Sequence, residues 1–339
     1  MGLISVKKPH HRERTTILVT GAGGFIGSHV TELLLHSGYS VRALVRYSSR
    51  GSWGHLSAMA DRSCLSLDVR FGDVVDPFLV RDLVLGCDTV LHLAALIGIP
   101  YSYVAPASYV ATNVTGTLNI LEACRQARTG RVVVTSTSEV YGTALYTPID
   151  EKHPLQGQSP YSATKIAGDK LAEAYFRSFD LPVVTLRPFN TYGPRQSARA
   201  VVPTILTQAL SGAEEIELGT LKPKRDLTYV EDTARAFLLA ATTPGIEGET
   251  IHFGQGSALS IGELARKCLP TVDSRARIVS VSDRLRPEKS EVGLLLCDAT
   301  KAKKVLGWAP EVTLEEGLRR TAEYLRDHLS EYCAKGYNV

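Results

Sequence analysis

The sequence predicts an α/β protein built on a doubly wound parallel sheet, followed by a smaller C-terminal α/β domain. Short apolar or β-branched segments alternate with helical patterns between residues 16 and 186, and this alternation is typical of parallel strands joined by crossover helices. A glycine-rich turn joins the first strand to the first helix. The 339 residues suffice for two domains, since domains commonly hold about 100–200 residues.

Composition and charge exclude several classes of protein. Apolar residues make up 44% and charged residues 22% of the chain, which is ordinary for a globular protein, and the net charge of +3 argues against a nucleic-acid partner. No apolar run reaches the ~18 residues of a membrane helix. The six cysteines show no metal-ligand spacing, so we expect reduced thiols, no metal and a cytoplasmic protein. Residues 1–14 are polar and lack a signal-peptide core, and we interpret them as a disordered lead.

The first strand, residues 16–20, leads directly into a GxxGxxG turn. Gly21 allows the tight turn, Gly24 lets the backbone approach a pyrophosphate, and Gly27 permits close packing of the helix on the strand. Phe25 and Ile26 begin that helix, whose free N–H groups and positive dipole end favour a phosphate. The turn therefore predicts a Rossmann-type dinucleotide-binding domain, which we place at residues 15–193.

The ends of the next strands bear on the cofactor. The second strand, residues 40–45, is followed by Arg46, without the acidic residue that usually holds the ribose 2′-hydroxyl of NAD. Arg46 suits the 2′-phosphate of NADP, or is a solvated arginine, so NADP is mildly favoured and NAD is not excluded. Asp73 and Val74, at the exit of the third strand, are predicted to face the adenine, with a simple turn as the alternative. Ala94 ends the fourth strand and leaves room for a cofactor.

The fifth strand, residues 132–134, leads to Ser136-Thr137-Ser138-Glu139. In open α/β sheets, ligands bind beyond the carboxyl ends of the strands, where the Glu139 carboxylate is placed to act as a base. The alternative is a polar exit from the strand, in which the hydroxyl groups only cap a turn.

Tyr161 and Lys165 lie four residues apart at the start of a helix predicted over residues 161–179. This spacing puts both side chains on one face of the helix. A nearby ammonium favours the phenolate, so we expect Lys165 to lower the Tyr161 pKa toward a range useful for acid–base catalysis. The alternative is a Tyr–Lys pair on the surface.

Residues 194–330 are predicted to form mainly a substrate-binding domain, with some segments returning to the first domain. We expect a strand over residues 215–218, a basic turn at 222–226, and helices over residues 201–210, 228–241, 300–306 and 314–329, with one more starting at the capping box of residues 260–263. Asn190 and the arginine-bearing turns around Arg225 and Arg286 suit a second phosphorylated ligand, although surface arginines are usually only solvated.

The motifs occur together in a recognisable order. Gly21-Ala22-Gly23-Gly24-Phe25-Ile26-Gly27, Ser136-Thr137-Ser138-Glu139-Val140-Tyr141-Gly142, Tyr161-Ser162-Ala163-Thr164-Lys165 and Arg187-Pro188-Phe189-Asn190 follow one another along the chain. From residue 16 to about 326 the chain resembles the extended short-chain dehydrogenase/reductases that act on nucleotide sugars. Through residues 47–54, 156–161 and 284–291 it is similar to nucleotide-sugar 4,6-dehydratases of the legionaminic-acid type, which act on a nucleotide-linked N-acetylglucosamine.

The resemblance implies a redox-neutral reaction on a nucleotide-diphosphate sugar with tightly bound NAD(P). Tyr161 takes the C4 hydroxyl proton while hydride leaves C4 for the nicotinamide, whose ribose Lys165 holds. Thr137 hydrogen-bonds the reacting hydroxyl, Glu139 removes the C5 proton, water leaves from C6, and the hydride returns to C6. The resemblance assigns contacts with the substrate's diphosphate or nucleotide to Asn190, Arg225 and Arg286.

Ser138 departs from the pattern of many 4,6-dehydratases, which have aspartate there. GDP-mannose dehydratases and UDP-glucuronate decarboxylases have serine. Because a serine hydroxyl is too weak an acid to replace aspartate, we expect Glu139 to serve as both base and acid, with Ser138 positioning it or a water. The alternative enzymes are a UDP-glucuronate decarboxylase and, third, a 4-epimerase. A non-catalytic NADP-binding scaffold is the alternative from another class, although such proteins typically lose the Tyr/Lys pair. The resemblance alone implies a homodimer formed through a helix pair.

Overall fold

The computed structural model describes residues 15–59, 66–285 and 287–332. Its centre is a seven-stranded sheet in the order β10-β6-β5-β4-β1-β2-β3, and every pairing in it is parallel. The predicted doubly wound sheet is therefore confirmed. Its strands are β1 (Thr16–Thr20), β2 (Ser40–Arg46), β3 (Leu67–Gly72), β4 (Thr89–His92), β5 (Arg131–Thr135), β6 (Val183–Pro188) and β10 (Thr250–Phe253).

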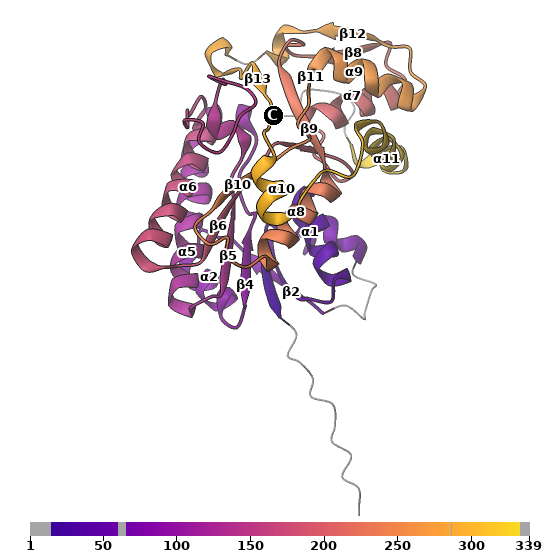
Figure 1. Cartoon of the computed structure of the whole chain (residues 1–339). Helices are drawn as coiled ribbons and strands as arrows, with labels where there is room; N and C mark the ends of the chain where they lie inside the picture. Colours follow the sequence, from indigo (N-terminus) through magenta and orange to yellow (C-terminus); the bar gives the residue numbers. More distant parts are fainter. Residues whose placement is uncertain (1–14, 60–65, 286, 333–339) are drawn as a thin grey trace, which may run out of the picture.

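Helices cover both faces of this sheet (Figure 1). One face carries α2 (Pro77–Val84), α5 (Gly116–Ala127) and α6 (Pro160–Phe179). The other carries α1 (Phe25–His36), α8 (Val230–Thr242) and α10 (Thr300–Leu306). A sheet enclosed on both faces has buried strands, which explains the continuous apolar run of β5, where residues 132–134 are at most 2% exposed.

The smaller unit draws on residues beyond β6 and lies at the upper right of Figure 1. One sheet has the order β11-β9-β13, with β7 also paired to β9, and β12 pairs with β8 in another. The capping box predicted at residues 260–263 is present at the start of α9. The elements are β7 (Asn190–Tyr192), β8 (Glu215–Leu218), β9 (Lys224–Tyr229), β11 (Ala258–Ser260), β12 (Arg277–Ser280), β13 (Leu294–Leu295), α7 (Val201–Leu210), α9 (Ile261–Cys268) and α11 (Leu314–Asp327).

One expectation about local structure is wrong in part. Residues 224–226 of the predicted basic turn at 222–226 belong to strand β9, because their backbone pairs with β11 and β13. In the larger unit, α4 (Pro106–Tyr109), a π-helical segment η2 (Val110–Thr115) and α5 form one continuous helical stretch.

The π-helical segment places Asn113 against the loop that follows β4. Its side-chain amide accepts a hydrogen bond from the Leu96 N–H at 2.8 Å and donates to the Leu96 carbonyl and to the Thr164 hydroxyl. Asn113 thereby joins the end of β4 to the first turns of α6. π-helical segments of this kind are frequent at functional sites.

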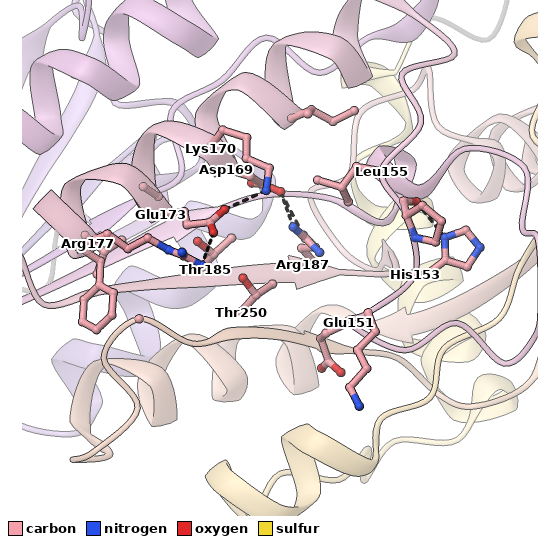
Figure 2. A pocket seen from close by; sticks show the side chains of 17 residues that line it. Glu151, His153, Leu155, Asp169, Lys170, Glu173, Arg177, Thr185, Arg187 and Thr250 are labelled. Atoms are coloured by element: carbon pink, nitrogen blue, oxygen red, sulfur yellow. Dashed lines mark hydrogen bonds and ion pairs between the residues drawn. The ribbon is translucent and has the colours of Figure 1, made fainter.

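Two cavities are prominent in the described part of the chain. One, of about 920 Å³, lies where β1, β4 and β5 end and includes residues of the smaller unit. The other, of about 840 Å³, lies between α6, the strands β6 and β10, and residues 151–155. Figure 2 shows its charged lining, with Asp169 of α6 facing Arg187 of β6. No helix among the described residues is long and apolar enough to cross a membrane.

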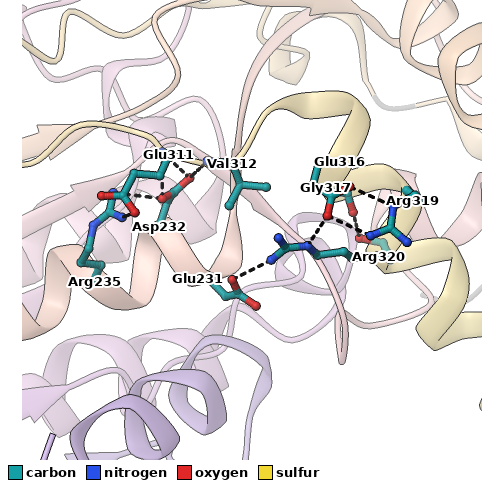
Figure 3. Close-up of polar contacts among 10 residues, drawn as sticks. Glu231, Asp232, Arg235, Glu311, Val312, Glu316, Gly317, Arg319 and Arg320 are labelled. Carbon is teal, nitrogen blue, oxygen red and sulfur yellow. Dashed lines mark hydrogen bonds and ion pairs between the residues drawn. The ribbon is translucent and has the colours of Figure 1, made fainter. Parts of the chain in front are cut away.

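A buried carboxylate ties the C-terminal segment to the central sheet (Figure 3). Asp232, on α8, is 1% exposed and accepts hydrogen bonds from the backbone N–H groups of Glu311 and Val312, both at 3.0 Å. Arg235 pairs with the same carboxylate at 3.0 Å. These contacts fix the chain just before α11, which packs on the smaller unit.

Replacing this carboxylate should destabilise the protein. Asp232→Ala leaves two backbone N–H groups without their acceptor, at about 1–3 kcal/mol for each buried unsatisfied group. We therefore expect the free energy of unfolding to fall by about 2–6 kcal/mol. Urea unfolding measures the change, with Glu231→Ala at the neighbouring exposed carboxylate as the control. Equal midpoints for the two variants would contradict this role of Asp232.

Candidate active site

The larger cavity brings together every predicted site residue that the structure describes. Residues far apart in sequence meet there because the carboxyl ends of parallel strands lie at one edge of the sheet. Arg286 lies outside the described residues. The predicted residues that line the cavity are Gly21, Gly24, Phe25, Ile26, Gly27, Arg46, Asp73, Val74, Ala94, Thr137, Ser138, Glu139, Tyr161, Lys165, Asn190 and Arg225.

The glycine turn is closely packed on its surroundings. Gly21 has a φ of +70°, and a Cβ there would lie 2.9 Å from the backbone nitrogen of Ala94. A Cβ on Gly27 would overlap the Gly21 carbonyl. Gly24 is the N-cap of α1 and supplies no side-chain acceptor to the first turn, so the N–H groups of that turn are left for an anion. The residues present therefore fit the diphosphate of a dinucleotide.

The residues predicted near the adenosine half of the cofactor lie on the rim of the cavity. Arg46, at the end of β2, is exposed. Asp73 is exposed too, and its carboxylate accepts a hydrogen bond from the Val75 N–H at 3.0 Å. This hydrogen bond within the turn is the kind of contact that the alternative interpretation, Asp73 as a turn residue, predicts. Val74 is 3% exposed and packs in the core under the rim.

Thr137, Ser138 and Glu139 lie in and just before a 3-10 turn, η3 (Ser138–Tyr141), that follows β5. Thr137 caps this turn, because its hydroxyl accepts a hydrogen bond from the Glu139 N–H at 3.2 Å. The same hydroxyl lies near the Tyr161 phenol and acts to lower its pKa. Capping and site formation, which the sequence presents as alternatives, thus occur at one residue. Ser138 is 2% exposed.

Tyr161 and Lys165 occupy the first turns of α6. A capping box between Ser159 and Ser162 fixes the start of this helix. Burial raises the pKa of Tyr161 above its ordinary value; the Thr137 hydroxyl opposes this rise and the charge of Glu139 adds to it. Burial, rather than Lys165, thus dominates the Tyr161 pKa in this structure.

Lys165 is held by the backbone of β5. Its amine donates a hydrogen bond to the Thr135 carbonyl at 2.5 Å. Burial lowers the pKa of Lys165 to about 8, and the Asp169 carboxylate opposes that shift. The expected lowering of the Tyr161 pKa by Lys165 therefore stays a prediction.

The residues predicted to bind the second ligand differ in their contacts. The side-chain oxygen of Asn190 is buried and has no hydrogen-bond partner among the residues that the structure describes, which leaves it an acceptor for a bound molecule. Arg225 is 7% exposed, donates to the Val292 carbonyl at 2.7 Å, and pairs with Glu291 at 3.1 Å. Arg225 thus already has partners within the protein.

Sequence reasoning missed other residues of the cavity wall. Trp53 and Gly54 reach it from the loop after β2, and Arg199 comes from the segment before α7. Arg199 belongs to no recognisable motif, and Trp53 and Gly54 lie in the segment 47–54 that carries the resemblance without being assigned a role in the site. The loop is held against the glycine turn by the His55 N–H, which donates a hydrogen bond to the Gly23 carbonyl at 3.0 Å, a contact that only the folded chain shows.

A glycine turn at the carboxyl ends of a parallel sheet, with Thr137, Tyr161 and Lys165 beside it, defines a short-chain dehydrogenase/reductase. The chain belongs to the extended, nucleotide-sugar-modifying branch of these enzymes: the family model described as GDP-mannose 4,6 dehydratase matches residues 18–321.

Known proteins of this family are similar along nearly the whole chain. A dTDP-glucose 4,6-dehydratase of Streptomyces niveus is 36% identical over 321 residues, covering 92% of this chain and 93% of the relative. The crystal structure of DesIV, a dTDP-glucose 4,6-dehydratase of Streptomyces venezuelae with NAD bound, has a TM-score of 0.84 and 31% identity, covering 94% of this chain and 99% of that one.

An epimerase is equally similar in fold. A mutant UDP-glucuronic acid 4-epimerase of Bacillus cereus, in complex with UDP-4-deoxy-4-fluoro-glucuronic acid and NAD, has a TM-score of 0.85 and 29% identity. The match covers 93% of this chain and 100% of the epimerase chain. Fold similarity therefore does not separate dehydratases from epimerases. The two activities have to be distinguished by the residues of the site.

Proposed function

We propose that the protein is a nucleotide-sugar 4,6-dehydratase that converts a UDP- or GDP-linked N-acetylglucosamine to its 4-keto-6-deoxy product. The observation that supports this most is Glu139, a carboxylate that lines the same cavity as Thr137 and Tyr161 and acts electrostatically on the Tyr161 phenol. Oxidation at C4 requires the tyrosine, whereas removal of the C5 proton requires a further base.

The proposed roles follow from these contacts. Thr137 orients the C4 hydroxyl, and Tyr161 accepts its proton. Once C4 is a ketone, the C5 proton is acidic; Glu139 removes it and donates a proton to the departing C6 hydroxyl, which leaves as water. Ser138, buried beside Glu139, positions that carboxylate or a water. At the nucleotide diphosphate end, the Asn190 side-chain amide group and the Arg225 guanidinium donate hydrogen bonds to phosphate oxygens, while the Asn190 side-chain oxygen is left to accept from a hydroxyl or N–H of the substrate.

A bound nicotinamide would supply the acceptor for the C4 hydride and the donor that returns this hydride to C6. C5 then regains a proton as Tyr161 releases the one that it took from the C4 hydroxyl. Gly21, Gly24 and Gly27 with the start of α1 would hold the cofactor's diphosphate, and Lys165 its ribose. Because the overall reaction is redox-neutral, no second substrate is needed to regenerate the cofactor. We therefore propose that the cofactor stays bound between turnovers.

A 4-epimerase is the second candidate function, favoured by the similarity to the Bacillus cereus enzyme. It would use Thr137 and Tyr161 in the same way but needs no carboxylate at Glu139. The UDP-glucuronate decarboxylase is the third candidate and rests on Ser138 alone. A non-catalytic scaffold would not need the Tyr161 and Lys165 pair that lines this cavity.

Mass spectrometry of the product tests the proposal. Purified protein is incubated with UDP- and GDP-N-acetylglucosamine without added reductant. The proposal predicts a product lighter by one water. A product of unchanged mass with inverted configuration at C4 would instead identify a 4-epimerase. Loss of carbon dioxide from UDP-glucuronate would identify a decarboxylase. No turnover of any nucleotide sugar would leave the non-catalytic scaffold as the remaining candidate.

We further propose that NADP binds in preference to NAD. This proposal rests on Arg46 alone, since the family structures described above hold NAD. A guanidinium paired with the 2′-phosphate is worth about 1.5–3 kcal/mol, so NADP should bind about tenfold or more tightly than NAD, and Arg46→Ala should remove the difference. Calorimetric titration of both cofactors measures this. Tighter binding of NAD to the unaltered protein would reject the preference.

The protein is proposed to be a homodimer formed through α5 and α6. Large apolar side chains are exposed on both helices, with Leu118 at 37% and Phe179 at 52%. Light scattering of the purified protein gives the mass directly, and a monomer at micromolar concentration would reject the dimer.

A further inference from the structure

Asp169 lies directly behind the active site. It follows Lys165 by four residues on α6, so the two side chains share a helix face. The Asp169 carboxylate is 5% exposed, and its Oδ2 accepts a hydrogen bond from the Ser136 hydroxyl at 2.8 Å and another from Arg187 Nε at 3.0 Å. Ser136 is the residue before Thr137, so Asp169 is joined to the strand end that carries the site.

Arg187 holds the carboxylate from the side of the second cavity. Its Nη2 lies 2.9 Å from Asp169 Oδ2, and its Nη1 donates to the Tyr141 hydroxyl at 3.0 Å. Figure 2 shows Asp169 on α6 and Arg187 on β6 pointing toward one another. The remaining carboxylate oxygen, Oδ1, is buried without a hydrogen-bond partner among the described residues. Arg187 is the cation that hydrogen-bonds this carboxylate directly.

Lys165 is in the opposite situation, a buried amine with a neutral partner. Its hydrogen bond goes to the Thr135 carbonyl, which does not compensate a charge, and burial favours loss of its proton. The titratable and charged groups close to Lys165 and Asp169 include Tyr161 on α6, Glu139 and Tyr141 on η3, Arg187 on β6 and His92 on β4. In the second cavity, Asp169 shares the lining with Glu151, Lys170 and Glu173. Burial and the charge of Lys165 keep His92 neutral by lowering its pKa to about 3. Among these groups, Asp169 is the anion that acts on Lys165.

We propose that Asp169 is a positioning residue of the active site: its carboxylate, fixed by Ser136 and Arg187, keeps Lys165 a cation. Asp169 touches neither cofactor nor substrate in this account and acts through Lys165. A charged Lys165 is what the site requires, both to hold a ribose hydroxyl and to favour the Tyr161 phenolate once the cavity is filled. Only the effect on the Tyr161 phenolate rests on the proposed function. The charge of Lys165 is a property of the protein alone.

The charge of Lys165 can be measured without turnover. Protein labelled at the lysine side-chain nitrogens is titrated by NMR, and the Lys165 signal is identified by its loss in Lys165→Met. Asp169→Asn should lower the Lys165 pKa by about one unit or more, since loss of a neighbouring opposite charge has an effect of that size. Asp169→Glu, which keeps the charge, should restore most of it. The alkaline limb of the pH profile of kcat should move down by the same amount in Asp169→Asn.

Arg187→Gln gives a test of opposite sign. Removing the guanidinium leaves the Asp169 charge uncompensated, so the Lys165 pKa should rise. A purely structural role would not produce shifts of opposite direction in the two variants. An unchanged Lys165 pKa in Asp169→Asn, or no upward shift in Arg187→Gln, would overturn the proposal. If the NMR shifts appear but no nucleotide sugar is turned over, the proposed function fails and the Asp169 proposal stands.

Discussion

Tyr161→Phe should lower kcat for oxidation of the sugar at C4 by about 100- to 10,000-fold, the usual effect of removing a general acid–base group. The phenol is the acidic group that lies against the Thr137 hydroxyl, where the reacting hydroxyl is proposed to bind. The change removes one oxygen atom and keeps the ring, which packs against Tyr109 at a centroid distance of 6.3 Å. Cofactor and substrate binding should therefore change little.

The measurement is the single-turnover rate of cofactor reduction, followed by its absorbance, with binding measured separately by calorimetry. Tyr109→Phe is a matched control, because its hydroxyl donates to the Gly98 carbonyl at 2.5 Å and has no proposed part in the reaction. A Tyr161→Phe variant that oxidises the sugar at an undiminished rate would mean that another group takes the C4 proton.

Glu139→Gln should separate the two halves of the reaction. The amide is nearly isosteric with the carboxylate but cannot remove a proton, so C4 oxidation should continue while overall dehydration falls by about 100- to 10,000-fold. The oxidised sugar, with its C6 hydroxyl still present, should accumulate on the enzyme.

Exchange of the C5 hydrogen with heavy water reports this step directly. The unaltered protein should incorporate deuterium at C5, and Glu139→Gln should not. Glu173→Gln serves as the control, because Glu173 pairs with Lys170 and Arg177 on α6 at the other cavity. Normal dehydration by Glu139→Gln would show that the base is wrongly assigned and would leave the carboxylate as a structural group.

Much of the site is predictable from sequence because its signals are local. The glycine turn needs a tight backbone path at Gly21, and the helix face shared by Tyr161 and Lys165 follows from their spacing alone. Parallel strands then bring these segments to one edge of the sheet without any further information. The order of motifs along the chain was therefore enough to gather the residues of the cavity.

The remaining features depend on contacts between distant segments. The edge strand β10 is short and has no motif, and the π-helical segment reflects the hydrogen bonds of Asn113 to Leu96 and Thr164. The pairing of Arg225 with Glu291 joins segments that no local pattern relates. The same holds for Asp169, whose importance depends on Arg187 and Ser136 arriving from two different strands.

The central claim is that hydrogen moves within one sugar molecule, from C4 to C6, as water is lost. The most direct test uses a nucleotide-linked N-acetylglucosamine labelled with deuterium at C4, incubated with the purified protein without reductant. The account predicts a 4-keto-6-deoxy product with the deuterium in its C6 methyl group. Deuterium retained at C4 of an epimerised sugar, or no deuterium at C6 of a dehydrated product, would contradict it.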